Sequence, residues 1–264
     1  MKISHSISLG TVCLLVINAS IRYANADEKL VQGIQVFQSA YDKWDAELFR
    51  KADRIFMKSS EQFPSDALPL YWKGAVQFHL VNYYLFGLEE LRDKKKAVIS
   101  IDNALAALEQ AVALDTAHAE SYALLGTLYG IKIYQKWRFA PVLGPKVFKL
   151  INHGLDLEPE NPRIQYLIGV SYLFTPKILG GGVSKGLTHL IKAEVFFDKE
   201  AKREAAPGEP RWGMSTNLGF IGKAYMKLKE TEKAETYFKK ALKVNPNDLL
   251  AKSGLKEVEK EKGK

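Results

Sequence analysis

Cysteine is almost absent from this chain. Its one cysteine, Cys13, follows Val12 inside an apolar run over residues 7–17. A bacterial lipid-anchor signal needs a small residue before its cysteine, so we expect no lipid anchor. One cysteine also excludes an internal disulfide and a cysteine-based metal site. The fold must therefore rest on a hydrophobic core, and 264 residues are enough to build one.

Long hydrophobic runs are missing as well. The apolar run over residues 7–17 is too short to span a bilayer, which needs about 20 residues. It follows Lys2 and precedes Ala24-Asn25-Ala26, the small-x-small pattern of a secretory cleavage site. We predict a signal peptide over residues 1–26 and export, to the periplasm of a Gram-negative bacterium; a buried N-terminal helix is the alternative. We expect no membrane span in the mature chain.

A strong charge of one sign is also absent. The formal net charge of +8 is small for this length, and basic and acidic residues are interspersed. The densest basic run, over residues 92–96, is typical of a solvated helix face or loop. Because nucleic-acid binding requires basic residues clustered on one face of a recognisable fold, we expect no nucleic-acid partner.

Residues arranged for chemistry are lacking too. No two histidines stand at the spacing of metal ligands, and there is no Gly-x-Ser-x-Gly nucleophile elbow. Gly181 and Gly186 have the spacing of a phosphate loop, but Leu187 stands where that loop needs lysine. We therefore expect no metal, no cofactor and no catalytic residue: the protein is predicted not to be an enzyme.

A helical period is what the sequence does contain. Residues 215–248 place Leu218, Gly222 and Tyr225 on a first helix and Phe238 on a second, and Pro246 ends the unit. This pattern resembles the tetratricopeptide repeat of about 34 residues. Weaker copies begin near residues 71, 122 and 168, and a faint first unit contains Ala40, Ala52, Phe56 and Pro64.

These copies predict the fold. One helical hairpin cannot bury its own apolar face, so hairpins must stack. We predict an all-α fold, a right-handed α-solenoid of about five tetratricopeptide-like hairpins over residues 27–264, with residues 249–262 as a polar capping helix. The spacing between copies exceeds the repeat length, which indicates inserts: around residues 137–145 and 174–182, between the helices of the unit that starts near residue 71, and between units around residues 199–214.

The glycine cluster lies in one of these inserts. Pro176 disfavours helix at the residue before it, and Gly180, Gly181 and Gly182 can adopt positive φ. We therefore interpret Pro176 and the three glycines as structural residues of the connection between two helices.

Two surfaces are candidates for binding. Inserts that emerge on one edge of a repeat array often form its binding face, which nominates Trp137, Arg138 and Lys177. The alternative for Trp137 is that it plugs the end of the core. The inner face of the stack, lined by first helices, nominates Trp72, His79, Arg163 and Tyr166, although Trp72 and Tyr166 also suit an ordinary core.

Longer motifs are similar to those of a group of exported bacterial repeat proteins. They are Asn161-Pro162-Arg163, Thr175-Pro176 with the glycine cluster, and Pro210-Arg211-Trp212-Gly213, and the resemblance covers roughly residues 119–248. It adds Trp212 to the candidate binding residues and implies a repeat protein with undefined partners. A weaker similarity to periplasmic accessory components of solute transporters gives the alternative function.

The sequence thus predicts a non-catalytic periplasmic scaffold. We expect this scaffold to bind a peptide or protein partner through its concave face and inserted loops. The oligomeric state is left open.

Overall fold

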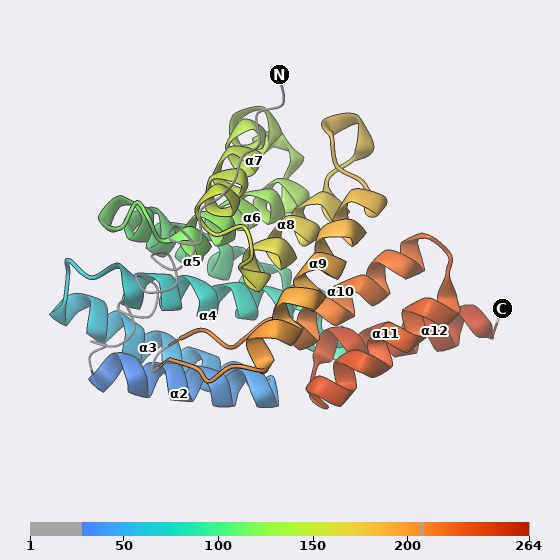
Figure 1. Cartoon of the computed structure of the whole chain (residues 1–264), viewed down its shortest axis with the longest axis horizontal. Helices are drawn as coiled ribbons and strands as arrows, with labels where there is room; N and C mark the ends of the chain where they lie inside the picture. Colours follow the sequence, from blue (N-terminus) through green and yellow to red (C-terminus); the bar gives the residue numbers. More distant parts are fainter. Residues whose placement is uncertain (1–27, 207–208, 264) are drawn as a thin grey trace, which may run out of the picture.

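The chain folds into a curved stack of helical hairpins (Figure 1). The computed structural model describes residues 28–206 and 209–263, and in these ranges it contains α-helices and short 3₁₀ turns but no β-strand. The predicted signal peptide lies outside the described residues. The helices are α2 (Glu28–Lys43), α3 (Ala46–Gln62), α4 (Ala67–Phe86), α5 (Lys94–Leu114), α6 (Ala119–Gln135), α7 (Ala140–Leu157), α8 (Pro162–Phe174), α9 (Val183–Ala201), α10 (Met214–Lys227), α11 (Thr231–Val244) and α12 (Leu249–Lys262).

Consecutive helices pair as antiparallel hairpins. The pairs are α2 with α3, α4 with α5, α6 with α7, α8 with α9 and α10 with α11, and α12 packs on α10 and α11. This confirms the prediction of an α-solenoid of helical hairpins. The faint first unit is a real hairpin, since Ala40, Ala52 and Phe56 are all buried.

Small residues set the distance between the helices of a hairpin. A side chain added at Gly33 would meet Phe56, one at Gly74 would meet Leu108, and one at Gly222 would meet Phe238. Each glycine on a first helix therefore accepts a large side chain from the second helix. Aspartate or asparagine caps begin many of the helices: Asp45, Asp66 and Asp93 accept hydrogen bonds from backbone N–H groups of the next turn.

The inserts differ from the predicted loops because much of their length is helical. In the hairpin that starts near residue 71, α4 and α5 are 20 and 21 residues long, which leaves a connection of residues 87–93. The insert expected over 137–145 is a 3₁₀ turn, η2 (Trp137–Phe139), followed by the first turns of α7. Pro141 is accommodated there because the first turn of a helix has no hydrogen bond for its ring nitrogen to break.

The insert between the last two hairpins closes the stack. The described part of this insert, residues 202–206 and 209–213, lies between α9 and α10 and ends against α2. At its end, the Gly213 N–H donates to the Tyr41 hydroxyl at 3.1 Å, and the Asn245 side chain donates to the Tyr41 carbonyl at 2.9 Å. Helix α12 also contacts α4. The N-terminal hairpin and the C-terminal helices are thus joined, and α12 is part of this closure as well as a cap.

One described helix, α5, has the length and apolar composition that a membrane crossing requires. A core helix of a water-soluble protein passes the same test. Here α5 pairs with α4 along one face and exposes Asp102, Asn103 and Glu109 on the other. We interpret α5 as the second helix of its hairpin.

Candidate functional site

The inner face of the stack is filled by the protein itself. Trp72, His79, Tyr166 and Trp212 are all almost completely buried, and the Trp212 indole is only 1% exposed. Trp212 comes from the 202–213 segment, and its ring lies 5.0 Å from that of His79 and 6.1 Å from that of Phe78. The expectation that Trp72, His79 and Tyr166 line an open binding face is therefore wrong, and the alternative of an ordinary core holds for Trp72 and Tyr166. Trp212, nominated from its motif, is itself a core residue that covers them.

Arg163 is also buried, in a network of ions. Its Nε donates to Glu120 at 2.6 Å, and its two terminal nitrogens donate to the Glu200 carboxylate at 3.0 and 2.8 Å. Glu120 also accepts from the Tyr71 hydroxyl and, at 2.8 Å, from the Asn161 side chain. Arg163 joins α6, α8 and α9 inside the protein and is not available to a partner, which corrects its assignment as a binding residue.

The electrostatics of this network favour its charged form. Burial alone would raise the pKa of Glu120, but Arg163 and the hydrogen bond from Tyr71 hold it below its usual value. Burial opposes the charge of Arg163 as well, yet the two carboxylates raise its pKa well above the usual value. Glu120 and Arg163 stay charged because the attraction between opposite charges offsets the free-energy cost of burying them.

His79 is enclosed by aromatic rings. It stacks on Phe49 at 5.6 Å, and the rings of Phe37 and Tyr41 approach its edges. Neither ring nitrogen has a hydrogen-bond partner among the described residues. Burial lowers the pKa of His79 from 6.5 to about 3, so the folded protein holds a neutral imidazole at this position.

This burial makes stability depend on pH. Between pH 6.5 and about 3, unfolded His79 binds a proton and folded His79 does not, so stability falls as the pH falls through this window. Lowering the pH from 7.5 to 4.5 is expected to cost wild type roughly 2.5 kcal/mol more than His79→Phe. Urea titrations of both proteins at both pH values measure this difference. Equal losses of unfolding free energy in the two proteins would contradict a lowered pKa of His79 in the folded state.

An open apolar groove lies on the edge where the inserted connections emerge. It encloses about 680 Å³ between α6, α7 and α8. The residues that line it are mostly aliphatic and aromatic: Phe86, Thr127, Gly130, Ile131, Ile133, Tyr134, Trp137, Ala140, Pro141, Gly144, Pro145, Val147, Phe148, Val170, Ser171, Phe174, Thr175, Pro176 and Leu179. Among them, Phe174 is a central contact, since its ring lies 5.5 Å from that of Phe86 and 5.6 Å from that of Tyr134.

The serine and threonine hydroxyl groups in the groove are already hydrogen-bonded. Thr127 donates to the Ala123 carbonyl at 2.9 Å and lies 3.3 Å from the Ser171 hydroxyl, and Thr175 donates to the Ser171 carbonyl at 2.7 Å. The groove therefore offers a ligand little hydrogen bonding from its floor. Its chemistry favours an apolar group.

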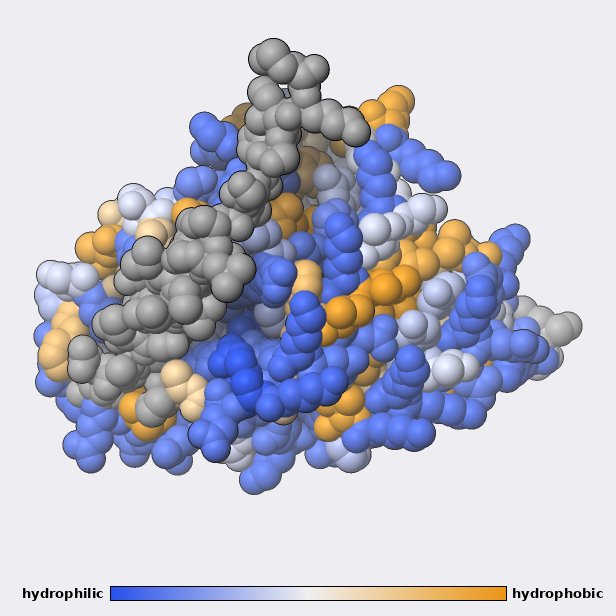
Figure 2. Space-filling model, viewed as in Figure 1, coloured by the Kyte–Doolittle hydropathy of each residue, from blue (hydrophilic) through white to orange (hydrophobic). Residues whose placement is uncertain are grey.

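Two 3₁₀ turns form the rim of this groove. Trp137, in η2, is 59% exposed although it lines the groove, so it does not plug the core. Arg138 is exposed beside it. On the opposite side, η3 (Lys177–Leu179) exposes Lys177, Ile178 and Leu179, and Ile178 is 92% exposed. Figure 2 shows mostly hydrophilic side chains on the face in view, with hydrophobic ones at the upper edge, where Figure 1 places this connection.

The glycine cluster shapes the second rim. Gly180 and Gly182 have φ values of +85° and +129°, which other residues rarely adopt. A side chain at Gly181 would collide with the backbone of Thr175, and the Gly182 N–H donates to the Tyr172 carbonyl at 2.9 Å. With Pro176 at the start of η3, these residues turn the chain tightly from α8 into α9.

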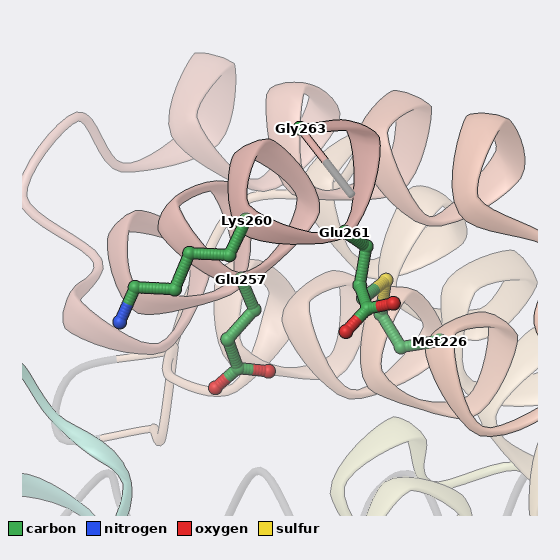
Figure 3. Close-up of a pocket in the computed structure, with 5 residues that line it drawn as sticks. All are labelled: Met226, Glu257, Lys260, Glu261 and Gly263. Carbon is green, nitrogen blue, oxygen red and sulfur yellow. The ribbon is translucent and has the colours of Figure 1, made fainter.

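A second depression lies at the far end of the stack (Figure 3). It is shallow and is lined by Met226, Glu257, Lys260, Glu261 and Gly263. Figure 3 shows that the Lys260 side chain points away from Met226, so the lining residues do not converge on a point. Glu257 is engaged by Lys223 at 2.6 Å. We therefore take the apolar groove as the candidate site.

The part of the chain that the structure describes contains no cluster of three histidine, cysteine or carboxylate side chains suited to a metal.

Comparisons with known proteins agree with this architecture. Residues 218–248 match the tetratricopeptide repeat model, so the last hairpin is a tetratricopeptide repeat. The fold is similar to that of a thermophilic tetratricopeptide-repeat protein from Thermus thermophilus, with a TM-score of 0.61, 16% identity, and 87% of this chain and 96% of that chain covered. It is also similar to the HusA haemophore from Porphyromonas gingivalis, with a TM-score of 0.57, 16% identity, and 85% and 96% covered. No curated protein matches the chain in sequence.

Sequence reasoning found the rim of the site but missed its floor. Trp137, Arg138 and Lys177 were nominated; Trp137 lines the groove, whereas Arg138 and Lys177 are exposed next to the lining residues Trp137 and Pro176. Ile133, Phe148 and Phe174 were not, because they follow helical periods like any core residue. One signal in the sequence marks the region: residues 121–155 and 161–193 contain no aspartate or glutamate.

Proposed function

We propose that this protein is a non-catalytic scaffold that holds an apolar anchor of a peptide or protein partner in the groove between α6, α7 and α8. The observation that carries the proposal is a groove of about 680 Å³ whose serine and threonine hydroxyls are already hydrogen-bonded and whose rim exposes Trp137. Tetratricopeptide repeats are scaffolds for protein interaction in general, and the last hairpin is one.

Several contacts must contribute to such a complex. Burying one leucine or phenylalanine anchor contributes roughly 1.5–3 kcal/mol. A micromolar complex needs about 8 kcal/mol, and association itself has a cost. The partner segment must therefore extend beyond the groove onto the rim, where Trp137 and Leu179 offer large apolar surfaces.

Gly144 offers a direct test of the groove. A side chain added there meets no atom within 4 Å, and Gly144 lies inside α7. Gly144→Trp is expected to fill the groove, whereas Gly144→Ala adds one methyl group. Both variants place a Cβ before Pro145, which disfavours the helical backbone there, so the alanine variant controls for this shared cost. The two variants differ mainly in the volume left for a ligand.

The experiment selects binders from a displayed library of random peptides of about 12 residues, with immobilised wild-type protein. Selected peptides are expected to contain an aromatic or aliphatic anchor, to bind Gly144→Ala like wild type and to bind Gly144→Trp at least tenfold more weakly; anisotropy of labelled peptides measures these affinities. Peptides that bind Gly144→Trp normally, or no selected peptide at all, would refute the proposal.

A small apolar ligand is a second candidate. The groove volume lies within the range of about 300–1,000 Å³ that is usual for small-molecule sites, and one protein of similar fold is a haemophore. Titration with haem, followed by absorbance and by quenching of tryptophan fluorescence, tests this candidate. Binding that Gly144→Trp abolishes and Gly144→Ala retains would favour it over the peptide.

We also propose that the protein acts in the periplasm. The support is the pattern of residues 1–26, which fits a secretory signal. Sequencing the N-terminus of the protein purified from its native envelope tests this: a mature chain starting near residue 27 is expected, and a chain starting at Met1 would contradict it. The transporter-accessory alternative predicts a stable oligomer, so a monomer in light scattering counts against that alternative.

A further inference from the structure

Charge is unevenly distributed around the groove. Two stretches of the sequence contain no aspartate or glutamate: residues 121–155 and 161–193. They contain α6 beyond its first turn, nearly all of α7, all of α8 and both 3₁₀ turns of the rim. These stretches do contain lysine and arginine, among them Lys136, Arg138 and Lys177. The charged residues in these two stretches are therefore all basic.

The basic residues on the rim have no carboxylate partners. Lys136 and Arg138 flank Trp137, Lys177 precedes Ile178, and all three side chains are exposed. Within residues 28–206 and 209–263, none of the three forms an ion pair. Lys132 differs: it lies on the side of α6 that faces α5 and pairs with Asp102 at 2.8 Å. The positive charges next to the lining residues Trp137 and Pro176 thus form no ion pair with the described residues.

A fourth cation touches the floor of the groove. The Lys227 ammonium lies 4.9 Å from the centre of the Phe174 ring, and its one hydrogen bond among the described residues is to the Leu173 carbonyl at 3.4 Å. Burial lowers the pKa of Lys227, and the nearby Lys223 lowers it further. Lys227 is exposed, lies over an apolar ring and forms no ion pair among the described residues, so it gains from a ligand that brings a carboxylate.

We propose that the partner segment is an acidic peptide, whose apolar anchor enters the groove while flanking aspartate or glutamate side chains meet the cations of the rim. This inference rests on the proposed function and specifies the partner's chemistry. An apolar groove next to exposed cations favours a peptide over a nucleic acid, because a nucleic acid has no aliphatic anchor to fill such a groove. It favours a peptide over a membrane surface, since the cations lie on two separate turns next to the groove rather than on one helix face.

The library selection described above also tests this inference, through the composition of the selected peptides. Peptides that bind through the groove are expected to be enriched in aspartate and glutamate next to the anchor. Affinity should fall roughly tenfold between about 50 and 500 mM salt, because exposed charges are screened. Neutral or basic peptides that bind wild type and fail on Gly144→Trp would overturn the acidic inference and leave the proposed function standing. The absence of any groove-dependent peptide would overturn both.

Charge reversal provides the second measurement. The triple variant Lys136→Glu, Arg138→Glu and Lys177→Glu is expected to bind an acidic peptide at least tenfold more weakly, and to prefer the same anchor flanked by lysine. The matched control is Lys51→Glu, Lys58→Glu and Lys243→Glu, which makes the same net change at exposed sites on α3 and α11, away from α7 (Figure 1). Equal weakening in both triples would show that only net charge matters and would overturn the inference.

Discussion

Replacing Arg163 with alanine is expected to lower the free energy of unfolding by about 3–5 kcal/mol. The change removes the cation that pairs with both Glu120 and Glu200, which are both buried, and Glu200 keeps only a longer contact of 3.8 Å with the exposed Arg203. Two carboxylates would then be buried without this partner, and burial would raise the pKa of Glu120 once Arg163 no longer opposes it. Urea unfolding at neutral pH measures the loss.

A combined variant identifies the cause. Glu120→Gln and Glu200→Gln, added to Arg163→Met, remove all three charges and keep most of the side-chain volume. We expect this triple variant to recover at least half of the loss, since burying uncharged groups avoids most of the cost of an unpaired ion. A loss below about 1 kcal/mol in Arg163→Ala would contradict the network described here.

Replacing Trp212 with alanine is the second change with a large expected effect. Its indole fills the inner face between α4 and α8, and its Nε1 donates to the Tyr71 hydroxyl at 3.3 Å. Truncation of a fully buried tryptophan costs about 3–5 kcal/mol. It also removes the group that anchors the 202–213 segment inside the stack.

Trp137→Ala is the matched control, because Trp137 is exposed. It is expected to change stability by less than about 0.5 kcal/mol and to weaken peptide binding, whereas Trp212→Ala mainly loses stability. If the two variants were equally destabilised, or if Trp212→Ala were as stable as wild type, the inner face would not be filled as described.

The fold could be predicted from the sequence because a repeat is a local pattern. The small residue Gly222 and the large residue Phe238 are 16 positions apart and meet within one hairpin. The filling of the inner face could not be predicted in this way. Trp212 and Tyr71 are 141 residues apart, and no periodic signal relates the 202–213 segment to the first helices that it covers.

The longer motifs have structural explanations. Asn161 caps α8, Pro162 begins it, and Arg163 forms the buried ion network. Trp212 is a core residue, and Gly213 adopts a φ of +112° that lets its N–H reach Tyr41. The resemblance to exported repeat proteins therefore rests largely on residues that build the fold, and of its motifs only Thr175-Pro176 lines the groove.

The central claim is that the inner face is closed and that the groove between the inserted connections is the open binding surface. Hydroxyl-radical footprinting of the free protein and of its complex with a selected peptide tests it most directly. Trp137, Tyr134 and Leu179 should be labelled in the free protein and protected in the complex, while Trp72, Tyr166 and Trp212 stay unlabelled in both. Labelling of Trp72 and Trp212 in the free protein that the peptide suppresses, with Trp137 unchanged, would contradict the account.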